Sequence, residues 1–290
     1  MQPWRLLDLA ANNAFENMAI DEAMMNACVR QNGAPATIRF YDWSHPAVSI
    51  GCLQRIRGNF DLDQVKELGL DTVRRPTGGR AVLHKGDLTY SLVFAEDNPV
   101  IPRGVLASYQ KISQAVQRGL WRLGIPSQLC PQSRVSSLCH SSKRKISRSP
   151  FCFSGVAQYE ILVHGKKIMG NAQKRTKGAC LQQASIMVED QHELIQRLFP
   201  QQELGTKGQR GKGTEEQRRC ASHSEFISLE EAFGCPVSVS LIKEALIRGF
   251  EEIFHLSFTF GSLTGWEEEE AARLVQEKYS QDLWNKEGHL

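Results

Sequence analysis

Two glycines flanked by charged residues form the most chemically suggestive run of this sequence, RRPTGGRAVLH at positions 74–84. Gly78 and Gly79 allow the backbone to approach a ligand closely and to offer N–H groups to a carbonyl or phosphate oxygen. A plain turn is the alternative, but Arg75 and His84 lie on either side, and polar residues that cluster in a loop favour a binding site. The run therefore predicts a loop that contacts a substrate oxygen.

A second run, GKKIMGNAQKR at positions 165–175, combines lysines with small residues. In a strand, Lys167 faces the side opposite to Lys166 and Ile168, so one lysine can point into a site while its neighbours face away. Taken alone, such a run is more often a charged hairpin in solvent. Its interpretation therefore depends on the rest of the chain.

The eight cysteines contain no CxxC pair and no disulfide-dense spacing, which disfavours both a zinc ribbon and a secreted disulfide scaffold. We accordingly expect free thiols and no metal site. Cys152 lies between Phe151 and Phe153. For a cysteine in such surroundings, buried packing is the ordinary role unless other residues indicate chemistry.

The two runs together closely resemble the superfamily of lipoate–protein ligases, biotin–protein ligases and octanoyltransferases, which carries an RRxxGGxxxxH block and a later GKKxxGxAQ block. Within it, RRPTGGRAVLH, the residues around Cys152, and EKY at 277–279 with WN at 284–285 are most similar to the LipM-type octanoyltransferases. The resemblance covers most of the chain. It implies an α/β fold with the mixed β-sheet catalytic domain of the biotin/lipoate–protein ligase type.

This resemblance also implies roles for individual residues. Cys152 lies 15 positions before Lys167, as in the LipM type, so Cys152 is expected to be the acyl-carrying nucleophile. A nearby ammonium stabilises the reactive thiolate, which is the role expected of Lys167. The residues expected to frame the acyl and carbonyl pocket are Arg75, Gly78, Gly79 and His84, and those expected on its opposite wall are Gly170, Ala172 and Gln173.

The same resemblance implies transfer of octanoyl from acyl carrier protein to a lysine of a lipoyl domain, such as the glycine cleavage H protein. Exchange of one thioester for another is nearly isoenergetic, so neither ATP nor another cofactor is expected. One departure from the family is Gln183-Ala184, where a His-Gly pair is usual. We therefore assign no catalytic role to Gln183.

Three alternatives remain open. An ATP-dependent lipoate–protein ligase shares the fold, and the lack of a Walker A motif is weak evidence against it because such ligases bind ATP without one. An amidotransferase that moves octanoyl between two lipoyl domains would use the same Cys–Lys pair. A binding module for nucleic acid or carrier domains, built on the basic loops 132–150 and 201–222, is disfavoured by their few aromatic residues.

Composition limits the remaining possibilities. With 290 residues, 41% hydrophobic residues and a formal charge of +3, the chain fits one large domain or one domain with a small appendage. The small charge argues against a nucleic-acid partner. The sequence carries neither a signal-peptide core nor an apolar run of roughly 20 residues, so we expect a cytoplasmic protein with no membrane partner.

Hydrophobic periodicity predicts the elements that position these residues. Helices are expected at 15–31, with Asp21 and Glu22 on the polar side, at 105–123 and at 192–199. Strands of one sheet are expected at 37–43, 47–51, 71–75 and 88–94, followed by a hairpin over 156–173 with its turn at 164–165, and a strand at 184–188.

The polar segment 201–222 predicts a flexible linker or insertion, and 132–150 an exposed loop. This divides the chain into a catalytic domain at 1–200, with its core at about 34–200, and a small α-rich C-terminal region at 223–290 packing on it. In that region, capping boxes are expected at 228–231 and 264–267, with helices at 241–254 and up to about residue 279.

Overall fold

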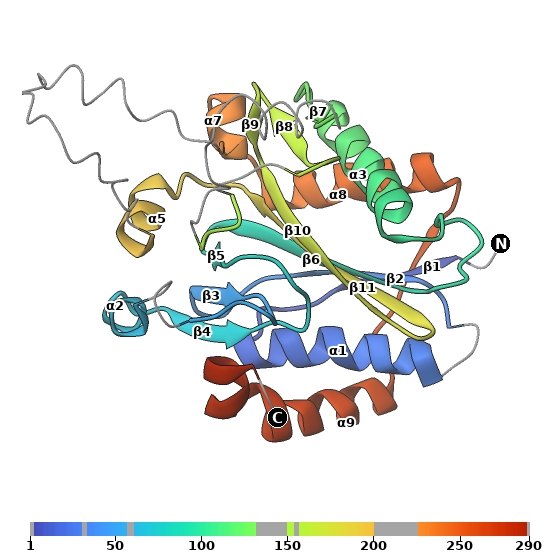
Figure 1. Cartoon of the computed structure of the whole chain (residues 1–290). Helices are drawn as coiled ribbons and strands as arrows, with labels where there is room; N and C mark the ends of the chain where they lie inside the picture. Colours follow the sequence, from blue (N-terminus) through green and yellow to red (C-terminus); the bar gives the residue numbers. More distant parts are fainter. Residues whose placement is uncertain are drawn as a thin grey trace, which may run out of the picture.

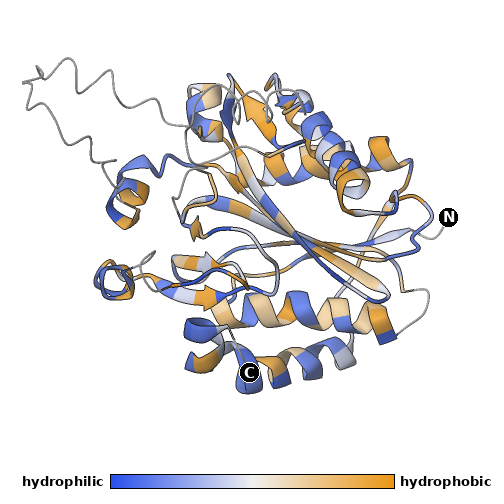
Figure 2. Cartoon of the chain, viewed as in Figure 1, coloured by the Kyte–Doolittle hydropathy of each residue, from blue (hydrophilic) through white to orange (hydrophobic). Residues whose placement is uncertain are grey.

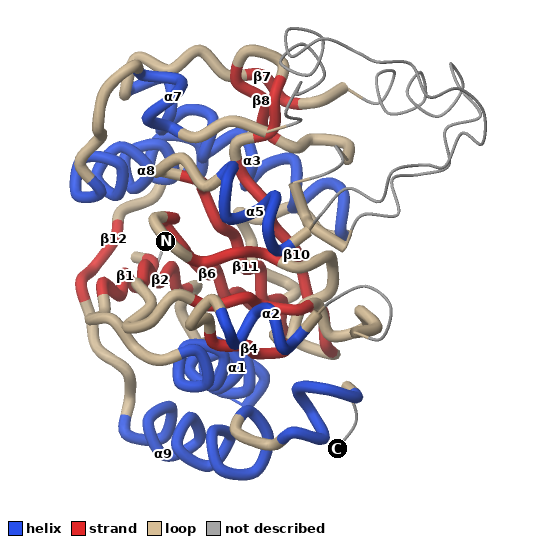
Figure 3. Tube along the Cα trace, turned by 90° about the vertical axis from the view of Figure 1, so that its left-hand side faces the viewer, coloured by secondary structure: helices blue, strands red, loops and turns tan. Residues whose placement is uncertain are grey.

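A six-stranded mixed sheet forms the middle layer of the protein, with helices on both faces (Figures 1 and 3). The computed structural model describes residues 3–30, 34–56, 61–131, 150–153, 157–199 and 226–288. The strand order is β10-β11-β6-β2-β1-β12. The strands are β1 (Trp4–Asp8), β2 (Thr37–Tyr41), β6 (Asp87–Ala95), β10 (Met169–Thr176), β11 (Ala179–Met187) and β12 (Phe258–Phe260).

The prediction that the early strands form one sheet is wrong. A second sheet, in the order β4-β3-β5, contains β3 (Ala47–Ile50), β4 (Asp71–Arg74) and β5 (Val82–His84). Because β2 already pairs with β1 on one edge and β6 on the other, it leaves no free edge for β3. The strand positions themselves are confirmed to within a few residues.

The predicted hairpin divides between two sheets. Its first part is β8 (Ile161–Val163) paired with β9 (Lys166–Lys167), which together with β7 (Gln128–Leu129) forms a third sheet. After Ile168 the chain leaves this sheet, and β10 pairs with β11 in the main sheet. Lys167 and Gly170 therefore approach the same region from different sheets.

The predicted long helices are confirmed as α1 (Ala14–Arg30) and α3 (Val105–Arg122), and the short one as α5 (His192–Leu198). The expectation that Asp21 and Glu22 face outward is wrong, because both are buried. Helix α9 (Gly265–Leu274) covers the side of α1 that the sheet leaves open (Figure 1). Asp21 is compensated by an ion pair of 2.7 Å with Arg39. A further short helix is α2 (Leu62–Glu67).

Helix α8 (Val239–Phe254) lies against α3 on the other face of the sheet (Figure 1). A Cβ added at Gly249 would lie 2.3 Å from the Ala115 carbonyl oxygen, so the two helix backbones are in contact there. Hydrophobic and hydrophilic residues alternate along α3 and α9 (Figure 2), as expected for helices with one face on the core. Apolar clusters fill both interfaces with the sheet.

The C-terminal region contributes to the main sheet as well as to the helical layers. It contains α7 (Leu229–Phe233), α8, α9 and two π-helical turns, η1 (Val275–Tyr279) and η2 (Leu283–Glu287). Its strand β12 pairs in parallel with β1. Both predicted capping boxes are confirmed. Segments 132–149 and 201–222 lie outside the described residues, so the predicted domain boundary stays a prediction. Within the described ranges, none of the helices has the length and apolar character needed to span a membrane.

Candidate active site

A pocket opens where the β3–β5 sheet meets β10 and β11. Its empty volume of about 350 Å³ includes open solvent at the mouth. Its lining combines apolar side chains with a few polar groups. The lining residues are Met18, Tyr41, Trp43, Ser49, Arg75, Val82, His84, Thr89, Cys152, Gly170, Asn171, Ala172, Gln183, Ala184 and Ser185.

Five of the residues singled out in the sequence line this pocket: Arg75, His84, Cys152, Gly170 and Ala172. Gly79 lies just behind it, because a Cβ there would be 3.6 Å from that of Ala172. Gly78 contributes its carbonyl oxygen, which accepts from Arg75. Gln173 is directed elsewhere, since its amide donates to Ser108 and Gln182 and thus faces α3.

Cys152 is presented to the pocket by its two neighbours. The rings of Phe151 and Phe153 are buried and stacked 5.4 Å apart, whereas Cys152 is only partly buried. Its backbone N–H donates to the Ala81 carbonyl at 2.8 Å. A Cβ at Gly170 would lie 3.0 Å from the Cys152 sulfur, so the glycine gives the thiol its room.

Lys167 reaches Cys152 from strand β9. Its Nζ lies 3.9 Å from Cys152 Sγ and 3.0 Å from the Cys152 carbonyl oxygen, and it forms a 2.6 Å ion pair with Glu160. The lysine is 1% exposed. Burial alone would lower the pKa of Lys167, but the negative charges at Cys152 and Glu160 outweigh it, so the pKa is raised. The lysine is therefore an ammonium at neutral pH.

Arg75 holds the glycine loop in shape. Its guanidinium donates to the carbonyl oxygens of Ser49, Gly78 and Arg80 at distances of 2.6 to 3.1 Å. Burial lowers the pKa of Arg75, and the nearby Cys152 opposes this shift. Because its donors are directed at backbone oxygens, Arg75 fixes the wall of the pocket and adds positive potential close to the sulfur.

His84 is fixed on three sides. Its Nε2 lies 2.8 Å from Ser49 Oγ, its Nδ1 lies 2.8 Å from an Asp87 oxygen, and its ring stacks on Trp43 at 3.9 Å. Asp87 also accepts from Thr89. A carboxylate beside Nδ1 favours the proton on that nitrogen, leaving Nε2 to accept from the serine hydroxyl.

Three residues of the site were not predicted from the sequence: Glu160, Ser49 and Asp87. The signal for Glu160 is a single acid in the apolar run YEILV, a position where an unpaired charge is costly. Gln183, to which the sequence assigned no catalytic role, lines the pocket, accepts from Thr77 and donates to buried Asp21 at 2.7 Å each. Through these two hydrogen bonds Gln183 connects the glycine loop to Asp21 of α1.

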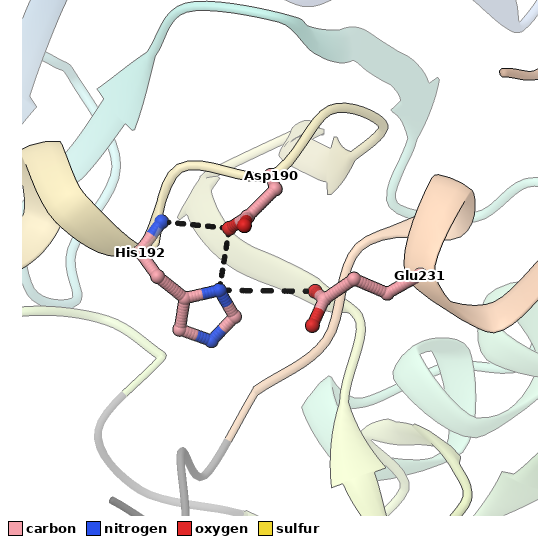
Figure 4. A group of neighbouring side chains, drawn as sticks. All are labelled: Asp190, His192 and Glu231. Carbon is pink, nitrogen blue, oxygen red and sulfur yellow. Dashed lines mark hydrogen bonds and ion pairs between the residues drawn. The ribbon is translucent and has the colours of Figure 1, made fainter. Parts of the chain in front are cut away.

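Among the described residues, three side chains outside the pocket are of types that bind metal ions: Asp190, His192 and Glu231. Their potential ligand atoms lie within 4.8 Å of one another (Figure 4). Both carboxylates already have partners. Asp190 accepts from the backbone and ring N–H of His192, and Glu231 accepts from Ser228 in the capping box of α7. This group therefore links the start of α5 to α7, and the absence of a resident metal stays a prediction.

Comparison with known proteins gives close relatives over the whole chain. Octanoyltransferase LipM of Symbiobacterium thermophilum is 39% identical over 286 residues, 97% of each chain. Octanoyltransferase LipM of Kyrpidia tusciae is 37% identical, over 98% of this chain and 99% of the relative.

Solved structures of lipoate–protein ligases are also similar to this chain over nearly its whole length. Lipoate-protein ligase A bound with ATP is 28% identical with a TM-score of 0.75, over 98% of this chain and 99% of that one. An archaeal lipoate protein ligase from Thermoplasma acidophilum, described with its E2 lipoyl domain, is 25% identical with a TM-score of 0.74, over 100% and 98%. The model of the lipoyl protein ligase A/B catalytic domain matches residues 13–251. With that pocket, that fold and these matches, the chain belongs to the lipoyl protein ligase A/B catalytic-domain family.

Proposed function

We propose that this protein transfers an octanoyl group from acyl carrier protein, through a thioester on Cys152, to a lysine of a lipoyl domain. The observation that carries the proposal is the contact of 3.9 Å between Lys167 Nζ and Cys152 Sγ at the edge of a largely apolar pocket. A thiol beside a buried ammonium is a nucleophile, and apolar walls suit an alkyl chain. The curated relatives named octanoyltransferase support the same reaction.

In the first half-reaction, the Cys152 thiolate attacks the carbonyl carbon of the octanoyl thioester on the donor. A bond forms between that carbon and Cys152 Sγ, the donor's C–S bond breaks, and the departing thiolate takes a proton from solvent. Lys167 stabilises the attacking thiolate electrostatically, and Arg75 and His84 hold the pocket wall against which the carbonyl is oriented. One thioester replaces another, so the step requires no ATP.

In the second half-reaction, the neutral amine of the acceptor lysine attacks the same carbon. A C–N bond forms, the bond to Cys152 Sγ breaks with its electron pair returning to sulfur, and the nitrogen releases a proton to solvent. The proposed acceptor is a lipoyl domain, with the glycine cleavage H protein as one example. The archaeal ligase described with its E2 lipoyl domain supports an acceptor of this kind.

A second candidate is an ATP-dependent lipoate–protein ligase, favoured by the structural similarity to the ligase bound with ATP. In such a ligase the acyl group is activated by ATP, and no cysteine forms a thioester with it. The octanoyl amidotransferase alternative differs only in the donor. The ligase predicts a requirement for ATP and no acyl group on Cys152. The amidotransferase predicts acylation of Cys152 by an octanoylated lipoyl domain.

The test is intact-mass analysis of the protein after incubation with octanoyl-acyl carrier protein without ATP. We expect a mass increase of one octanoyl group, lost in Cys152→Ala and kept in Cys235→Ala, which removes an exposed thiol instead. Subsequent addition of a lipoyl domain should discharge the adduct. Product that forms only from free acid and ATP, or equally in Cys152→Ala, would favour the ligase. An adduct formed only from an octanoylated lipoyl domain would identify the amidotransferase.

A further inference from the structure

A buried carboxylate contacts Lys167 and does not belong to the residues that line the pocket. Glu160 is 5% exposed, and each of its oxygens has a defined partner. One oxygen lies 2.6 Å from Lys167 Nζ, and the other accepts the backbone N–H of Ala157 at 2.7 Å. The carboxylate is thus fixed in position, with Lys167 held between it and Cys152.

Lys167 needs this partner most when Cys152 is acylated. Burial and the nearby Arg80 both disfavour the charged lysine, while Cys152 and Glu160 favour it. Conversion of the thiolate to a thioester removes one of the two favourable charges, and a lysine buried without sufficient compensation can have a pKa of about 5–6. The carboxylate of Glu160 persists through both half-reactions.

We propose that Glu160 is a positioning residue that keeps Lys167 charged and directed at Cys152 Sγ while the thiol carries the acyl group. The inference rests on the proposed function, because it concerns the acyl-enzyme. Its consequence lies in the second half-reaction. When the acceptor amine forms its C–N bond and the C–S bond breaks, the electron pair returning to Cys152 Sγ develops its charge beside an ammonium that is already in place.

Among the described residues around this site, the other charged and titratable groups do not replace Glu160. Arg75 and Arg80 are cations. Burial, with the charges of Glu160 and Cys152, raises the pKa of Tyr109 well above its ordinary value, so the phenol is neutral. Among the described residues, the carboxylate that contacts Lys167 Nζ belongs to Glu160.

The experiment measures transfer from preformed octanoyl-enzyme to a lipoyl domain in single turnovers between about pH 5 and pH 8. The ratio of variant to wild-type rate at each pH cancels the titration of the acceptor amine. In Glu160→Gln, Lys167 loses its proton as pH rises, so we expect the ratio to fall by at least about tenfold over this range. A ratio constant with pH would overturn the inference.

Two further variants connect the pH dependence to Lys167. Arginine stays charged at all these pH values, so Glu160→Gln combined with Lys167→Arg should lose the decline with pH that Glu160→Gln shows alone. Glu267→Gln is the matched control, since Glu267 is a buried carboxylate paired with Arg5 at 2.5 Å and belongs to α9, the helix on the other face of the sheet. It should lower stability and leave the ratio independent of pH. A decline of equal size in the double variant or in Glu267→Gln would contradict the proposed role.

The failures of the two proposals are distinguishable. If the wild-type protein forms no adduct on Cys152, the proposed function fails and the inference with it. If the wild type forms the adduct and Glu160→Gln discharges it with an unchanged pH profile, only the inference fails. Should Glu160→Gln not fold, Glu160→Asp lengthens the 2.6 Å contact and should give a smaller decline of the ratio. A wild-type rate at every pH in Glu160→Asp would then overturn the inference.

Discussion

Cys152 owes its position to its two buried neighbours rather than to any feature of its own side chain. Phe151 and Phe153 are buried in the apolar cluster around β3 to β5, and Cys152 between them is partly buried and lines the pocket. Lys167 is also buried, and its long side chain places Nζ 3.9 Å from the Cys152 sulfur. At the scale of single residues, the site therefore consists of reactive groups held by rigid apolar neighbours.

The electrostatic role of Lys167 can be measured before any substrate is added. Lys167→Met should slow alkylation of Cys152 by iodoacetamide at about pH 7, because the thiolate loses the ammonium that lies 3.9 Å from its sulfur. Lys167→Arg should retain the charge but alter the geometry, giving an intermediate rate. Mass-resolved labelling of Cys152 reads the result. Alkylation of the Met variant at the wild-type rate would show that Lys167 does not activate the thiol.

At the scale of elements, helices α3 and α8 form a layer whose spacing is set by glycine. Gly119 and Gly249 face each other, and a Cβ on Gly249 would lie 2.3 Å from the Ala115 carbonyl oxygen and 2.6 Å from the Gly119 nitrogen. This close crossing keeps both helices on the sheet behind β6, β10 and β11 (Figure 1). The strands β10 and β11, which line the pocket, pack their other face against this helical layer.

Gly249→Ala should destabilise the protein by about 1–3 kcal/mol, because the helix backbones must separate to admit the methyl group. Helix propensity by itself would favour alanine by about 1 kcal/mol, so the sign of the change tests the contact. Gly265→Ala is the matched control: Gly265 begins α9, and a Cβ there meets nothing within 4 Å. Urea unfolding of both variants gives the comparison. Equal or greater stability of Gly249→Ala would contradict the observed crossing.

At the scale of the whole molecule, the C-terminal turn η2 braces the end of strand β4, which leads into the glycine run. The backbone N–H of Arg74 donates to Asn285 Oδ1, and the Trp284 ring N–H donates to the Arg74 carbonyl, each at 2.8 Å. The Arg74 guanidinium continues to the Gly51 carbonyl at 2.9 Å. Gly51 in turn packs on Gly79, since a Cβ there would lie 2.0 Å from the Gly79 oxygen.

Asn285→Ala should therefore affect both stability and activity. It leaves the buried Arg74 N–H without its acceptor, a loss of about 1–3 kcal/mol, and it loosens the wall that carries Arg75. We expect a lower Tm and a reduced kcat/KM for octanoyl transfer. Lys286→Ala is the control, because its ion pair with Asp282 is solvent-exposed and should contribute about 0–1 kcal/mol. Indistinguishable Tm and kcat/KM values for the two variants would show that the brace is not needed.

The sequence by itself determined the elements with strong periodicity and the local motifs. The helices at 14–30 and 105–122 and both capping boxes follow from short-range spacing, which depends only on neighbouring residues. The resemblance of its motifs indicated Cys152 and Lys167 as the residues to examine together. The tertiary structure decided what long-range pairing controls: the separation of the early strands into two sheets, and the switch of the chain between sheets after Lys167.

Only the fold could place Glu160 against Lys167 and Ser49 against His84. Both contacts depend on strand register and on packing around the pocket, so neither follows from the identity of a single residue. The burial of Glu160 is decided in the same way, because a charge in an apolar run is stable only where the fold supplies its partner. The sequence therefore specifies the reactive side chains, whereas the tertiary structure specifies which charges surround them.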